Sequence, residues 1–185
     1  MNIIFFGSPY YSCKVIESLL ASNHVIQAVI TQNFKNNRKT KTPVGLFSES
    51  KNINTLYPAD LTDKKFIDIL KSYNADLYII YAYGKILPPE LIVLPKHGVI
   101  NIHCSLLPKW RGAAPIQRAL QNGDQQTGVT FFKIDESLDT GEIISSYEYN
   151  IEDNDDALLL QDKLTQIAID RLEEVILLNL NSSKF

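Results

Sequence analysis

The sequence is poor in cysteine, in excess positive charge and in long apolar runs, and each shortage excludes a class of protein. Two cysteines, Cys13 and Cys104, are too few for a disulfide framework or a cysteine-rich zinc site. A net charge of −3 is not typical of a nucleic-acid-binding protein, so any RNA contact must come from a local basic patch. No apolar run reaches the length of a membrane span, and no signal or transit segment precedes the first predicted strand. We therefore expect a soluble, cytoplasmic protein that does not interact with membranes.

Predicted strands and helices alternate along almost the whole chain, and 45% hydrophobic residues suffice for a core. This alternation is typical of an α/β fold with an open, mainly parallel, Rossmann-like sheet that carries helices on both faces. Ligands of such sheets bind at the carboxyl ends of the strands. We expect strands at 2–6, 25–31, 54–57, 77–82, 99–103, 128–134 and 142–151, and helices at 11–21, 43–51, 113–120 and 156 to about 178, with further helices beginning near 62 and 88.

The segment from Gly98 to Gly112, GVINIHCSLLPKWRG, has the pattern of a functional site. Asn101 and His103 alternate with apolar residues near the end of a predicted strand, so both side chains leave the same face. The amide can donate two hydrogen bonds, and the imidazole can donate, accept or titrate. A purely structural pair, with both side chains satisfied locally, is the alternative interpretation.

A carboxylate follows another predicted strand, at Asp139 in the short turn 135–141. At the end of a strand, a carboxylate can hold an imidazole in one tautomer. An amide, an imidazole and a carboxylate together supply the oxyanion donor, the proton shuttle and the orienting charge that acyl-type transfer needs. The sequence therefore predicts Asn101, His103 and Asp139 as catalytic residues, without a metal and without a covalent enzyme intermediate.

These motifs resemble those of the folate-dependent formyltransferases. The resemblance rests on Asn101-Ile102-His103, on SLLP at 105–108 and on Asp139-x-Gly141, and it runs from Ile3 to about Leu178. The stretch WRGAAPIQRA at 110–119 is similar to the methionyl-tRNA formyltransferase family in particular. The resemblance implies transfer of a formyl group from 10-formyltetrahydrofolate to the α-amino group of methionyl initiator tRNA. Asn101 and His103 would stabilise the tetrahedral intermediate, and Asp139 would assist them.

The resemblance also implies which residues contact the two substrates. The folate would lie against the turn after the strand at 77–82 and against the SLLP turn. The alternative for the turn after 77–82 is that it only leads the chain out of the strand and contacts no ligand. The tRNA would meet Ser8 and a basic loop whose cations attract phosphates, although a charged, solvated loop without that role is also possible. Folate contacts are expected from Tyr83, Gly84, Leu87, Ser105, Leu106, Leu107 and Pro108, and tRNA contacts from Ser8, Lys35, Arg38, Lys39 and Lys41.

Residues 1–178 are expected to form the formyltransferase catalytic domain, and 179–185 the start of a linker or a C-terminal tail. Relatives of the kind implied by the resemblance carry a further β-rich, tRNA-binding domain, which has no counterpart in these residues. A monomer is expected. Two other functions remain open. One is a folate-dependent N-formyltransferase that acts on an amino-sugar nucleotide; the other is a truncated, non-catalytic remnant that binds folate or RNA.

Overall fold

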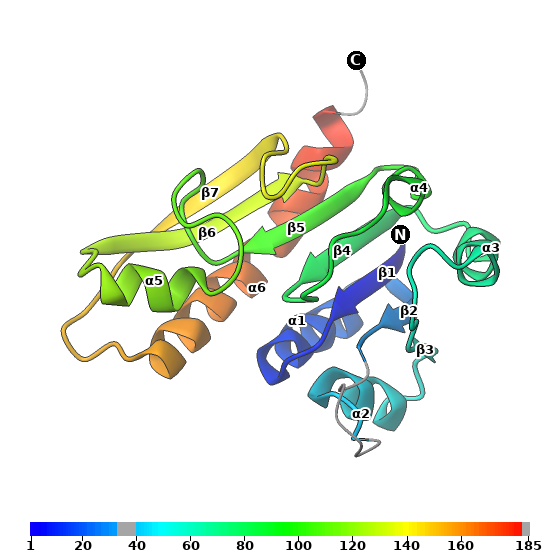
Figure 1. Cartoon of the computed structure of the whole chain (residues 1–185), viewed down its shortest axis with the longest axis horizontal. Coiled ribbons are helices and arrows are strands. Elements are labelled where there is room, and N and C mark those ends of the chain that lie inside the picture. The colour runs from blue at the N-terminus through cyan, green and yellow to red at the C-terminus, as the bar shows by residue number, and fades with distance from the viewer. Residues whose placement is uncertain (33–39, 183–185) are drawn as a thin grey trace. The chain divides into compact units, whose positions relative to one another are not determined.

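The computed structural model describes residues 1–32 and 40–182, and the chain forms two compact units, Met1–Ile100 and Asn101–Phe185 (Figure 1). All the predicted helices and strands are present in the described residues, and the α/β class is confirmed. No helix in this part of the chain is both long enough and apolar enough to span a bilayer.

The first unit is built on parallel strands in the order β3-β2-β1-β4. β1, at its centre, is almost wholly apolar, and Ile3–Phe6 have no exposed surface, which explains why the sequence pattern is continuous rather than alternating. The carboxyl ends of β1, β2 and β4 therefore point the same way. The elements are β1 (Asn2–Gly7), α1 (Tyr10–Ala21), β2 (Val25–Ile30), α2 (Pro43–Ser50), β3 (Thr55–Leu56), α3 (Lys64–Ser72), β4 (Leu77–Tyr81) and α4 (Pro89–Ile92).

Two helix starts in this unit follow directly from local sequence. Thr42 caps α2, since its hydroxyl accepts from the backbone N–H of Gly45 at 3.0 Å, and Pro43 occupies the first turn. Asp63 caps α3 in the same way through the N–H of Lys65 at 2.9 Å.

Gly7 serves packing at the end of β1. A Cβ on Gly7 would lie 2.7 Å from the ring of Phe5 and 2.9 Å from the carbonyl oxygen of Tyr81 on β4. Its missing side chain lets α1 approach the sheet, and Ser12 of that helix donates to the Tyr81 carbonyl at 2.8 Å. The structure thus gives Gly7 a packing role.

The second unit contains the end of β5 (Val99–His103), followed by α5 (Pro115–Gln121), β6 (Gln126–Lys133), β7 (Ile143–Asn150) and α6 (Ala157–Ser182). β6 and β7 form an antiparallel hairpin, in contrast to the parallel pairs β1–β2, β1–β4 and β2–β3 of the first unit. α6 packs on β6, on β7 and on α5 (Figure 1).

α6 differs from its prediction in two details. The helix continues to Ser182 rather than ending near Leu178, because Asn179 is completely buried and prolongs the packed face by a turn. The buried face runs through Leu160, Leu164, Ala168, Leu172 and Val175, and so advances in steps of about four residues. The spacing of the apolar residues in this part of the sequence also places Ile167 on the buried face, but Ile167 lies at the margin of that face with intermediate exposure.

A buried carboxylate anchors the loop before α6. The side chain of Asp155 has no exposed surface and accepts from Lys163 at 2.7 Å, the Glu152 N–H at 2.9 Å and the Tyr149 hydroxyl at 3.1 Å. Burial raises the pKa of the Asp155 carboxyl, but these donors outweigh it and hold the pKa below the ordinary value of 3.8. The folded state is therefore stabilised by the ionised form.

We expect this carboxylate to make part of the stability depend on pH. Because the folded-state pKa is depressed, its contribution is complete above the unfolded pKa and is lost as the pH falls through the folded pKa. Denaturant unfolding measures the difference in unfolding free energy between wild type and Asp155→Asn. This difference should be constant above about pH 5 and become smaller below about pH 4. Asp153→Asn, on the exposed surface of the same loop, is the control. A gap for Asp155→Asn that stays constant down to pH 2 would contradict the assignment.

Candidate active site

The structure brings His103 and Asp139 together within the second unit. His103 ends β5, and its Nδ1 lies 3.8 Å from Oδ2 of Asp139. The two side chains are 8% and 10% exposed, so water screens the charge of this carboxylate only weakly. The structure thus places the carboxylate beside the imidazole.

The other ring nitrogen of His103 faces the backbone. Nε2 lies 2.9 Å from the carbonyl oxygen of Trp110, and a carbonyl only accepts, so Nε2 carries a proton and donates it. Both nitrogens therefore face an acceptor, and a neutral ring can donate to just one of them. This hydrogen bond to the backbone was not predicted, because every residue has a carbonyl group and the sequence does not show which one the ring contacts.

Asp139 also holds the loop that follows β5. Its Oδ2 accepts from the backbone N–H of Gly112 at 2.7 Å, so one oxygen atom faces both the His103 ring and the loop. The backbone of Asp139 is left-handed, with φ of 52°, a conformation that Asp and Asn adopt more readily than most residues. The carboxylate therefore couples the geometry of the loop to that of the imidazole.

Gly141 lets the 135–141 turn cross the end of β6. A Cβ at this position would lie 1.7 Å from the carbonyl oxygen of Lys133 and 3.3 Å from the N of Asp135, so any side chain must displace the turn. This requirement gives a physical reason for the glycine two residues after Asp139.

Replacing Gly141 by alanine is expected to cost about 2 kcal/mol of unfolding free energy, in the range for overpacked sites, and to move Asp139. Urea unfolding measures the loss. Gly123→Ala is the matched control: a Cβ there meets nothing within 4 Å, and only its left-handed φ of 67° is unfavourable, at about 1 kcal/mol. Equal losses for the two variants would argue against the close crossing.

Asn101 lies two residues before His103 on the same face of β5 and is half-buried. Its side-chain amide makes no hydrogen bond with residues 1–32 or 40–182. An amide at a strand end that none of the described residues engages can donate to a ligand. This property fits the oxyanion donor expected from the sequence.

The SLLP turn is fixed to β6 through Thr130, which has no exposed surface. The Thr130 hydroxyl donates to the Ser105 carbonyl at 2.7 Å and accepts from the Leu107 N–H at 3.1 Å. The Ser105 hydroxyl donates to the Lys109 carbonyl at 2.6 Å, so it is used inside the turn rather than toward a ligand. Leu106 and Leu107 are partly exposed and Pro108 is exposed, which leaves these three as the accessible residues.

The segments that follow three strands of the first unit, β1, β2 and β4, also meet. The backbone carbonyl of Tyr83 accepts from the Ser8 hydroxyl at 3.3 Å and from the side-chain amide of Gln32. Burial raises the pKa of the Tyr83 phenol, and its ring, like Leu87, is almost inaccessible. Of the predicted folate residues in this unit, only Gly84 is exposed, with φ of 77° that suits glycine.

Of the residues predicted to contact tRNA, Lys35, Arg38 and Lys39 lie outside the described residues. Lys41 is exposed and pairs with Glu49, which also accepts from the Tyr57 hydroxyl at 2.8 Å. Exposed ion pairs are weak, so this contact leaves Lys41 able to exchange Glu49 for another anion.

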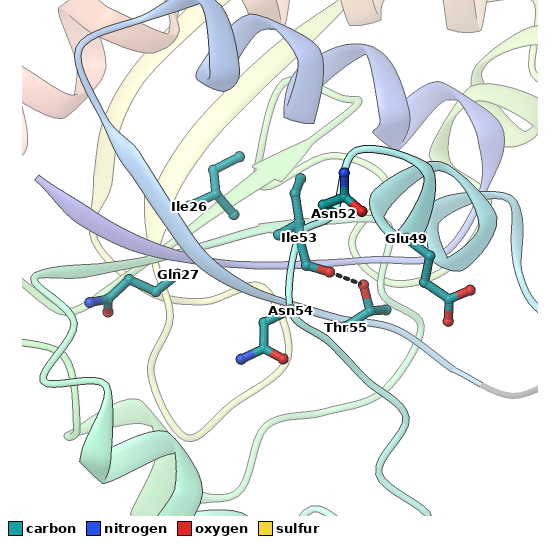
Figure 2. A pocket seen from close by; sticks show the side chains of 7 residues that line it. All are labelled: Ile26, Gln27, Glu49, Asn52, Ile53, Asn54 and Thr55. Carbon is teal, nitrogen blue, oxygen red and sulfur yellow. Dashed lines mark hydrogen bonds between the residues drawn. The ribbon is translucent and has the colours of Figure 1, made fainter.

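A shallow depression of about 620 Å³ lies elsewhere in the first unit, and Figure 2 shows its lining residues. It is formed by β2, the end of α2 and the segment that enters β3, where the Thr55 hydroxyl donates to the Ile53 carbonyl at 2.9 Å. It contains none of the predicted site residues. Over residues 1–32 and 40–182, no group of three His, Cys, Asp or Glu side chains could hold a metal ion.

Known proteins resemble this chain in sequence and in fold. A family model described as formyl transferase matches residues 1–176. The methionyl-tRNA formyltransferase of Pelagibacter ubique is 41% identical over 178 residues, which are 94% of this chain and 57% of that protein. The enzyme of the same name from Prochlorococcus marinus is 43% identical over 170 residues, 89% of this chain and 52% of that protein. The chain thus spans a little over half the length of these curated relatives.

Among solved structures, phosphoribosylglycinamide formyltransferase from Bacillus halodurans superposes with a TM-score of 0.79 at 25% identity, over all of this chain and 96% of that one. A formyltetrahydrofolate deformylase from Pseudomonas syringae has a TM-score of 0.73 at 24% identity, over 92% of this chain and 58% of that one. The latter likeness concerns the fold alone.

Proposed function

Because this chain belongs to the formyl transferase family, we propose that it transfers a formyl group from 10-formyltetrahydrofolate to the α-amino group of methionyl initiator tRNA. The observation that carries the proposal is the buried pair of His103 and Asp139, 3.8 Å apart, beside an Asn101 amide that is open to a ligand. The choice of acceptor is supported by relatives about 40% identical that are named methionyl-tRNA formyltransferase.

In the proposed reaction the amine nitrogen bonds to the formyl carbon, and the carbonyl oxygen takes up the electron pair as an oxyanion. Asn101 donates to this oxygen; removing one such donor typically costs about 10² to 10³ in rate. One proton must leave the amine, and one must reach N10 of the folate as the bond between carbon and N10 breaks. His103 carries this proton, and Asp139 stabilises the imidazolium that forms.

The accessible residues of the two predicted folate turns are chemically suited to a flat, partly apolar ring. Leu106, Leu107 and Pro108 offer apolar surface, and Gly84 lets a ligand approach the backbone. Tyr83 and Leu87 would act from beneath, by fixing the shape of the turn rather than by touching the folate.

A transfer assay tests the proposal. The chain is given 10-formyltetrahydrofolate together with charged initiator tRNA and, in parallel, amino-sugar nucleotides. We expect a formyl group on the methionyl tRNA alone. Formylation of an amino sugar instead would transfer the proposal to that acceptor, and folate binding without any transfer would identify a non-catalytic protein.

The basic loop can be tested although it lies outside the described residues. Replacing Arg38 and Lys39 together by alanine is expected to raise KM for the tRNA about tenfold with kcat unchanged, since phosphate contacts act mainly on affinity. The slope of a plot of log KM against log salt concentration should fall by about 1 for each cation removed. The control is the double change Lys64→Ala and Lys65→Ala at the exposed start of α3, which alters net charge equally. Similar effects of both pairs would contradict a specific role for the loop.

A further inference from the structure

The loop that binds the imidazole has an unusual backbone. Trp110, Gly112 and Ala114 are all left-handed, with φ of 58°, 83° and 61°. Trp110 and Ala114 adopt this conformation only where surrounding contacts enforce it. Because the carbonyl of Trp110 accepts from Nε2 of His103, the contacts that hold Trp110 also determine the position of the ring.

Asp124 holds the side chain of Trp110 by a hydrogen bond. Asp124 follows α5, and its Oδ2 accepts from Nε1 of the Trp110 indole at 2.7 Å. This hydrogen bond joins the segment before the helix to the segment after it. Oδ1 of Asp124 accepts from Asn122 at 2.7 Å and from Lys109 at 2.9 Å, and the side chain is 5% exposed. Burial raises the pKa of this carboxyl, but the three donors together hold it below the ordinary value, so the bonds are made by the ionised form.

We propose that Asp124 is a positioning residue of the active site, which acts on His103 through the indole and the backbone carbonyl of Trp110. The inference rests on the function proposed above and adds to it the tautomer of the imidazole. Nε2 keeps its proton on the Trp110 carbonyl, and Nδ1, beside Asp139, is the nitrogen that exchanges a proton with the substrates. Two carboxylates that follow α5 in the chain thus hold one loop, Asp139 at Gly112 and Asp124 at Trp110.

Four variants separate this role from a merely structural one. Asp124→Ala removes both acceptor oxygens of the side chain. Trp110→Phe removes the indole N–H together with the five-membered ring that carries it, while it keeps an aromatic ring and the backbone. Each should lower kcat about 30-fold with KM for folate nearly unchanged, because a small displacement of a catalytic group can cost up to about 100-fold. The double variant should lose no more than either single one, since both break the same bond. Asp124→Asn keeps an acceptor for the indole and should recover most of the rate.

Lys109→Met is the matched control, since it removes the half-exposed ion pair and leaves the bond between Trp110 and Asp124 intact. Its kcat should stay within about threefold of wild type, because Asp124 keeps the hydrogen bonds from Trp110 and Asn122. If Trp110→Phe retains the wild-type rate, the proposed route through the indole is wrong, even where Asp124→Ala is inactive because it folds poorly.

A readout that does not depend on turnover comes from ¹⁵N NMR of the imidazoles. The chain has three histidines, so His103 can be assigned by its disappearance in His103→Gln. We expect the Nε2–H tautomer in wild type and in Lys109→Met, and a mixture of tautomers in Trp110→Phe. An unchanged His103 spectrum in Trp110→Phe would overturn the positioning role. A spectrum that changes as expected in a protein without formyl transfer would instead overturn the proposed function and leave the positioning role standing.

Discussion

Replacing His103 by alanine is expected to lower kcat for formyl transfer about 10³-fold, within the range of about 10² to 10⁴ for a positioned acid–base group. The proton that leaves the amine would lose its carrier, and the oxyanion would lose a neighbouring positive charge. KM for the folate should change little, because the ring is 8% exposed and offers the ligand little surface. Single-turnover measurement with formyl-labelled folate separates this chemical step from product release.

His97→Gln is the control for this experiment. His97 precedes β5 by two residues and lies in the first unit, and no role in the reaction is given to it. Its variant should transfer formyl groups at the wild-type rate. If His103→Ala keeps more than about a tenth of the wild-type kcat, the assignment of the proton to this ring is wrong.

Asp139→Asn should lower kcat about 10²-fold or more while the protein keeps its stability. Asparagine also tolerates the left-handed backbone and offers an oxygen to the N–H of Gly112, so the loop remains in place. The negative charge beside Nδ1 of His103 is lost, however, and in a buried pair that charge stabilises the imidazolium by more than it could in water. Rate and unfolding free energy, measured on the same sample, distinguish the charge from the hydrogen bond.

Asp135→Asn provides a matched change in the same turn. Asp135 accepts from the Ser137 N–H at 3.0 Å and from the Thr140 hydroxyl at 2.9 Å, and it is exposed. The Asp135→Asn substitution removes the same charge as Asp139→Asn without changing a neighbour of His103, so the rate should be nearly unchanged. If both variants are equally slow, the effect of Asp139→Asn reflects the shape of the turn or the overall charge rather than the imidazole.

The fold could be predicted almost completely because the signals are local. Apolar runs mark β1 and β4, Pro43 and Asp63 mark helix starts, and the spacing of Leu160 and Leu164 marks the packed face of α6. The end of α6 was missed, since burial of the polar Asn179 depends on tertiary packing and not on its own residue type.

The candidate site was only half predictable. Side chains with distinctive chemistry, His103 and Asp139, could be paired from their places at strand ends. The groups that hold them could not: Trp110 acts through a carbonyl, Gly112 through an N–H, and Asp124 through a contact 14 residues along the chain. Backbone groups are identical in every residue, so only a three-dimensional structure shows which of them touches the imidazole.

The two uses of one oxygen atom on Asp139 limit how far this active site can be transplanted. An engineer who copied only the histidine and the carboxylate to another protein scaffold would leave that oxygen without the amide that orients it. The smallest unit that can be transferred is therefore the whole segment from the end of β5 to the 135–141 turn before β7. It must include Gly141, which lets that turn cross the end of β6.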